Sequence, residues 1–198
     1  MTTSRIQLSA FLLGFAAIVM QVILMRELFV VFYGNELSFG FFLGIWMSWV
    51  ACGAALGNSF KPATVRRFSF PLLLPLSLIF SVCAVLGIAF IRYLFRVPYG
   101  ELLSLHELII TNIVILAIPC LFLGLQFSFL SKQLSKTDNP SAIIYIFEAL
   151  GSVTASLFYT FILVRYFSNV HILFFVMILM AIFFISTLKS QRRLIATI

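Results

Sequence analysis

Six long apolar segments restrict what this chain can fold into. They cover about residues 6–31, 37–59, 70–91, 105–130, 141–164 and 169–188. A helix needs about 20 apolar residues to cross the hydrocarbon core of a bilayer, and all six segments meet this length. Because a helix satisfies its backbone hydrogen bonds internally, the sequence predicts an all-α bundle of about six transmembrane helices.

The composition supports a membrane protein with no soluble part. Hydrophobic residues make up 63% of the 198 residues and charged residues 10%, with a mean hydropathy of +1.16. Soluble domains have about 25% charged residues. The longest connections, 60–69, 92–104 and 131–140, are too short to bury a core. We therefore expect one transmembrane domain over 1–198. The absence of GxGxxG, P-loop and HExxH motifs indicates that the chain is not an enzyme.

The positive charges predict the orientation in the membrane. Lys and Arg outnumber Asp and Glu by 13 to 6, but the cations lie in loops between apolar segments, which favours lipid headgroups over nucleic acid as their partner. One side of the predicted bundle has nine of the 13 cations: Arg5, Lys61, Arg66, Arg67, Lys132, Lys136, Lys189, Arg192 and Arg193. The other side has Arg26, Arg92, Arg96 and Arg165. We expect both termini to be cytoplasmic, in a bacterial inner membrane.

The first apolar segment is expected to remain in the protein. From Ile6 to Met25 it is about 20 residues long, too long for the core of a typical signal peptide, and no small-x-small cleavage site follows it.

Small residues predict close helix packing. In the second segment Gly40, Gly44, Ser48 and Cys52 recur every four residues, and Gly53 and Gly57 form another GxxxG pair. In the fifth segment Gly151 and Ala155 have the same spacing. Small side chains on one helix face allow another helix to approach closely. The alternative is a narrow passage lined by backbone.

Charged residues near the outer end of the first segment form a candidate site. Arg26 and Glu27 are adjacent, so they point about 100° apart on a helix and do not pair easily. We expect Arg26 to reach Glu36 or an acid on another helix, because an unpaired buried charge is costly. The alternative is a charge network that only fixes the helix ends.

Glu148 is the candidate for an intramembrane function. It follows Ser141 by about seven residues, or roughly 10 Å of helix, and its immediate neighbours are apolar. An acid at this depth is by default a candidate proton acceptor or cation ligand. The alternative is a protonated, hydrogen-bonded structural glutamic acid.

Other polar residues in the segments have more modest predicted roles. Gln21, Asn112 and Gln126 are expected to form interhelical hydrogen bonds. His106 and His171 begin the fourth and sixth segments on the same predicted side, where a pair of histidines can ligate haem b. Capping of helix ends is the alternative. The three cysteines lie in separate apolar segments without a CxxC pair, and no metal site is expected.

Two stretches of the sequence show a family resemblance. The first runs from Gln21 through Arg26, Glu27, Tyr33, Gly34 and Glu36 to Gly57, and the second from Tyr145 through Glu148, Gly151 and Ser152 to Leu163. Together they resemble the membrane half of the membrane-bound spermidine synthase-like proteins, also described as fused major-facilitator/spermidine synthase proteins. In that family a catalytic aminopropyltransferase domain follows the helices, and its motifs are missing here. The resemblance implies a membrane module without catalytic residues, with Tyr145, Glu148 and Gly151 as matching positions.

We therefore expect a non-enzymatic transport-like module, or a membrane subunit of a larger complex. Its expected partners are the lipid bilayer, a homo- or hetero-oligomer with other membrane or redox subunits, and a cationic small molecule such as a polyamine. No cofactor is expected. A second hypothesis is an accessory or anchor subunit of a respiratory electron-transfer complex that binds haem b or quinone. A third is a membrane anchor for a separate aminopropyltransferase.

Overall fold

The computed structural model describes residues 3–34, 36–61, 73–96, 104–134 and 139–196, and these form helices and short connections without a β-strand. The helices are α1 (Thr3–Phe32), α2 (Glu36–Ser59), α4 (Leu73–Ala89), α5 (Ile91–Leu94), α6 (Leu105–Gln133), α7 (Pro140–Phe158), the π-helix η2 (Tyr159–Leu163), α8 (Val164–Tyr166) and α9 (Asn169–Ala196). The predicted all-α fold is confirmed for these residues. The predicted loop cations Arg66, Arg67 and Lys136 lie outside them.

Four of the helices are long and apolar enough to cross a membrane. They are α1, α2, α6, and the segment Pro140–Tyr166 that joins α7, η2 and α8. The other two predicted spans correspond to shorter apolar helices, since α4 has 17 residues and the apolar part of α9 is Asn169–Phe183. Each predicted segment thus contains a helix, and four of them reach spanning length in the described part of the chain.

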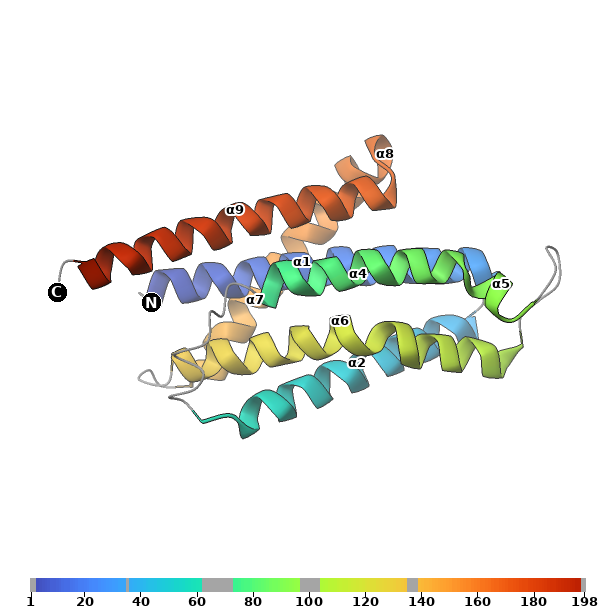
Figure 1. The fold of residues 1–198 in the computed structure, drawn as a ribbon, viewed down its shortest axis with the longest axis horizontal. Coiled ribbons are helices and arrows are strands. Elements are labelled where there is room, and N and C mark those ends of the chain that lie inside the picture. The colour runs from blue at the N-terminus through green and yellow to red at the C-terminus, as the bar shows by residue number, and fades with distance from the viewer. Residues whose placement is uncertain (1–2, 35, 62–72, 97–103, 135–138, 197–198) are drawn as a thin grey trace.

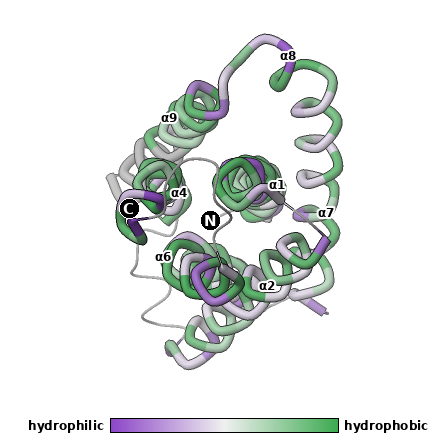
Figure 2. Tube along the Cα trace, turned by 90° about the vertical axis from the view of Figure 1, so that its right-hand side faces the viewer, coloured by the Kyte–Doolittle hydropathy of each residue, from purple (hydrophilic) through white to green (hydrophobic). Residues whose placement is uncertain are grey.

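Helix α1 occupies the centre of the bundle (Figure 2). Half of the residues in its most apolar stretch are buried, against 17% for α2 and 22% for Pro140–Tyr166. It packs chiefly against α7 and also contacts α4, α6 and α9, whereas α2 packs chiefly against α6. In Figure 1, α7 crosses α1 obliquely, and the first and last helices have their chain ends at the same end of the bundle. Of the four helices of spanning length, α2 and Pro140–Tyr166 are therefore the least buried.

The α2–α6 contact brings backbone against backbone. A Cβ atom on Gly53 would meet the carbonyl group of Leu121, and one on Gly124 would meet the carbonyl oxygen of Val50. The hydroxyl of Ser128 donates a 2.7 Å hydrogen bond to the carbonyl oxygen of Ala54 across the same contact. Close packing predicted from Gly53 is thus present, and it requires glycine on both helices.

The α1–α7 crossing has the same construction. A Cβ on Gly14 would meet the carbonyl oxygen of Glu148, and one on Gly151 would meet that of Phe11. The hydroxyl of Ser152 donates a 3.2 Å hydrogen bond to the carbonyl oxygen of Gly14. Gly151 therefore packs as predicted, with Gly14 as a partner that the spacing pattern did not identify.

The prediction of close packing is wrong within this chain for Gly40 and Gly44. No atom of the described residues lies within 4 Å of the position that a Cβ would take on either residue, whereas a Cβ on Gly57 would lie 2.7 Å from the Cβ of Ser128. Gly44 and Gly53 are nine residues apart, so at 100° per residue they lie on opposite faces of α2. Only the face with Gly53 and Gly57 meets α6.

Lys132 closes the end of the α2–α6 pair. Its Nζ donates hydrogen bonds to three carbonyl oxygens at the carboxyl end of α2: Gly57 at 3.1 Å, Asn58 at 2.6 Å and Phe60 at 2.6 Å. The last carbonyl groups of a helix have no partner in that helix, and a cation there also interacts favourably with the helix dipole. Lys132 thus links the ends of α2 and α6, in addition to being one of the cations that predict the orientation.

Gly124→Ala should lower the free energy of unfolding by about 1–3 kcal/mol, because the new methyl group forces α2 and α6 apart. Gly44→Ala is the matched control and should raise it by up to about 1 kcal/mol, since alanine favours the helix and nothing obstructs it there. Unfolding of the detergent-solubilised protein by dodecyl sulfate, followed by circular dichroism, measures both. Equal stabilities would contradict the packing described for Gly124.

Candidate functional site

Glu148 lies in the α1–α7 crossing. It is eight residues beyond Pro140, or about 12 Å along the helix. It follows the buried Ile144 by one turn and precedes the buried Gly151 by almost one turn, so it shares the α7 face that meets α1. Its side chain is half-buried, and no hydrogen bond or ion pair to it is found among the described residues. A carboxyl group is thus held inside an apolar helix with no partner in the described part of the chain.

A second polar group of residues joins α1, η2 and α9. Arg26 Nη1 donates to the hydroxyl oxygen of Tyr159 at 3.0 Å, and that hydroxyl donates to Asn169 Oδ1 at 3.4 Å. Asn169 Nδ2 then donates to Glu27 Oε1 at 2.6 Å. Every donor in this series faces an acceptor, from the guanidinium to the carboxylate. Hydrogen bonds arranged in this way polarise and strengthen one another.

This series corrects the predicted pairing of Arg26. Arg26 contacts Tyr159 rather than Glu36, which is exposed at the start of α2. The adjacent Arg26 and Glu27 point apart on α1, as expected, and are linked indirectly through two other elements. The network fixes the relative positions of three segments, which agrees with the structural alternative given for these charges.

Tyr159 is buried and begins the π-helix. A π-helical turn adds one residue to a helix, which changes the direction of the side chains after it, and such turns are frequent at functional sites. Tyr159 and Asn169 were not identified from the sequence. Their partners are 133 and 142 residues away, and no local pattern indicates such contacts.

Two other candidates lie apart from these groups. The side chain of Tyr145 is 66% exposed on α7, away from the α1 contact. Gln21 is half-buried on α1, seven residues after Gly14 and therefore on nearly the same face. Gln21 therefore lies on the side of α1 that faces α7, whereas Tyr145 does not lie on the side of α7 that faces α1.

The buried polar residues of α6 do not form the predicted interhelical bonds. Asn112 Nδ2 donates to the carbonyl oxygen of Leu108 in the same helix at 2.8 Å. The amide nitrogen and oxygen of Gln126 are buried without a hydrogen-bond partner among the residues that the structure describes. Within the described residues these two predictions are wrong, because Asn112 reaches the preceding turn of its own helix and no partner is found for the Gln126 amide.

The two histidines contact serines near their own helix starts. A ring nitrogen of His106 lies 2.9 Å from Ser104 Oγ, and Nδ1 of His171 lies 2.6 Å from Ser168 Oγ. Helix α9 packs mainly on α4 and α1 rather than on α6, the helix of His106. The arrangement agrees with the capping alternative. No cluster of three or more His, Cys, Asp or Glu suited to a metal ion occurs in the described part of the chain.

Comparisons of this chain with protein-family models, with curated proteins and with solved structures found no match.

Tyr159→Phe should lower the free energy of unfolding by about 0.5–1.5 kcal/mol, because Arg26 and Asn169 lose the hydroxyl between them. Tyr145→Phe is the control, since that side chain is exposed, and should change the value by less than about 0.5 kcal/mol. Denaturation in detergent measures both. A Tyr159→Phe variant as stable as the control would mean that the series contributes nothing to stability.

Proposed function

We propose that this chain is a multi-pass protein of the bacterial inner membrane, with six spans and both termini in the cytoplasm, and that it acts as a non-enzymatic transport-like module. Four helices of spanning length and two shorter apolar helices support this topology. The predicted excess of cations at the end of the bundle that holds both chain ends supports the orientation. The resemblance to the membrane half of the spermidine synthase-like proteins belongs to the same proposal.

The transport proposal depends on the carboxyl group of Glu148, for which the described residues provide no hydrogen-bond or ion-pair partner. An ionisable group inside a span is costly to bury, and a structural glutamic acid is expected to have a hydrogen-bond partner. Around Glu148, Gly14 and Gly151 bring two backbones together, which fixes the position of the helix but leaves the carboxyl oxygens available. A carboxylate here attracts a proton or a cation, which makes an organic cation such as a polyamine the proposed substrate.

Assembly with a second bundle belongs to the proposal as well. Transporters of this size often need another copy or another subunit to enclose a path. The low coverage of α2 and of Pro140–Tyr166, with 17% and 22% of their spanning residues buried, leaves large apolar surfaces for lipid or for a partner. A transport-like module that assembles with a second bundle is also a membrane subunit of a larger complex, so the two descriptions form one proposal.

Reporters at the two chain ends test the topology. A fluorescent protein that folds only in the cytoplasm should fluoresce when fused to either end, and a phosphatase active only in the periplasm should be inactive at both. Both ends are expected in the cytoplasm because the distribution of cations sets the orientation of a membrane protein during insertion. Ends in opposite compartments would disprove the six-span arrangement.

Glu148→Gln tests the mechanism in proteoliposomes with radiolabelled spermidine as the probe. The amide has nearly the same size but no charge, so uptake should fall by about tenfold or more, a loss of at least ~1.4 kcal/mol in the interaction with the cation. Glu36→Gln is the matched control, because that acid is exposed at a helix end, and it should transport normally.

Two outcomes would count against this mechanism. Unaltered uptake by Glu148→Gln would remove Glu148 from it. Absence of uptake by the unmodified protein would remove the polyamine as substrate.

A further inference from the structure

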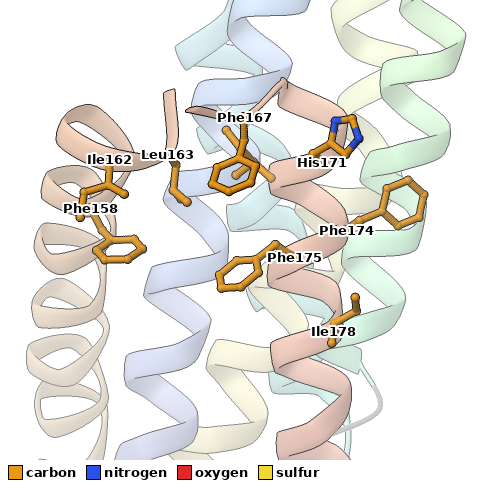
Figure 3. A pocket seen from close by; sticks show the side chains of 9 residues that line it. Phe158, Ile162, Leu163, Phe167, His171, Phe174, Phe175 and Ile178 are labelled. Carbon is orange, nitrogen blue, oxygen red and sulfur yellow. The ribbon is translucent and has the colours of Figure 1, made fainter. Parts of the chain in front are cut away.

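An apolar groove lies between α7 with η2 on one side and α9 on the other. Its volume is about 440 Å³. Eight of its lining side chains are apolar: Phe158, Ile162, Leu163, Phe167, Ile172, Phe174, Phe175 and Ile178. In Figure 3, Phe158 and Phe175 come from opposite walls, and Phe167 lies at one end. The groove thus has the surface of a site for hydrocarbon.

The groove surface is almost entirely apolar, and one of its lining residues is polar. His171 is its polar lining residue and lies near Phe167 (Figure 3). Arg165, in the adjacent α8, is exposed, and its guanidinium lies 5.9 Å from the ring centre of Tyr166. No ion pair or hydrogen bond of Arg165 is found in the described residues. His171 thus lines an otherwise apolar groove, and the cation Arg165 precedes another lining residue, Phe167, by two positions in the chain.

We infer that this groove binds an acyl chain of an anionic phospholipid, with the lipid phosphate at Arg165 and His171. A guanidinium binds phosphate oxygens through paired, charge-assisted hydrogen bonds. His171 lies in the first turn of the 28-residue helix α9, where the helix dipole favours a negative group. The chain of the lipid then extends along the apolar walls toward Ile178.

The size of the groove favours an acyl chain over a helix of a partner protein. A helix with its side chains is about 10–12 Å wide, so two turns fill roughly 850–1,200 Å³. The groove, with about 440 Å³, offers roughly a third to a half of that volume. It is, however, within the range of about 300–1,000 Å³ that is usual for small-molecule sites.

Native mass spectrometry of the full chain in detergent tests this inference, with phosphatidylglycerol and phosphatidylcholine of identical acyl chains as probes. Phosphatidylglycerol should bind about tenfold more tightly, because a choline headgroup weakens the contact with Arg165. Ile178→Trp fills the groove and should reduce phosphatidylglycerol binding by about tenfold or more. Ile182→Trp is the matched control, one turn further along α9, exposed and outside the lining, and should bind normally.

Arg165→Gln removes the proposed contact with the lipid headgroup and leaves the lining of the groove unchanged. The side chain is exposed, so the fold should be unchanged, and this variant keeps the inference testable if Ile178→Trp does not fold. It should bind both lipids equally. Three results would overturn the inference: full binding by Ile178→Trp, equal binding of the two lipids by the unmodified protein, or a bound isoprenoid quinone that phosphatidylglycerol does not displace.

Discussion

Direct contact between helix backbones is the constraint on which this structure depends. Lipid surrounds the helices with an environment as apolar as their own side chains, so close packing and interhelical hydrogen bonds must hold them together. Gly14 and Gly151 allow this between α1 and α7, and Gly53 and Gly124 between α2 and α6. The hydroxyls of serines at both contacts reach carbonyl oxygens only because the backbones are this close.

The same constraint explains the position of Glu148. Its carbonyl oxygen faces Gly14, so the backbone of α7 is fixed at this residue without any contribution from the carboxyl group. A side chain that is not needed for packing is free to interact with a ligand, whereas Arg26 and Glu27 are engaged in a network that connects α1 with η2 and α9. Of the charged residues singled out from the sequence, Glu148 therefore has the strongest case for a function beyond structure.

The sequence predicted what depends on local hydropathy and missed what depends on the relation between helices. The six apolar segments were located because each is a continuous stretch of the sequence with high hydropathy. The glycine spacing in α2 is identical on its two faces, and nothing in it indicates that Gly53 meets another helix while Gly44 does not. The role of Tyr159 depends on a π-helical turn and on the approach of α9, which no pattern within its own segment encodes.

The hydrogen-bond series from Arg26 to Glu27 also affects the electrostatic field of the molecule. Its two ends carry opposite charges and are joined within one network, so at a distance they act as a dipole rather than as a free cation and a free anion. The carboxylate of Glu27 offsets the charge of Arg26, so the end of the bundle that contains them is less positive than its arginines alone suggest. The difference in charge between the two ends, on which a potential across the membrane acts, is therefore larger than a count of cations alone would give.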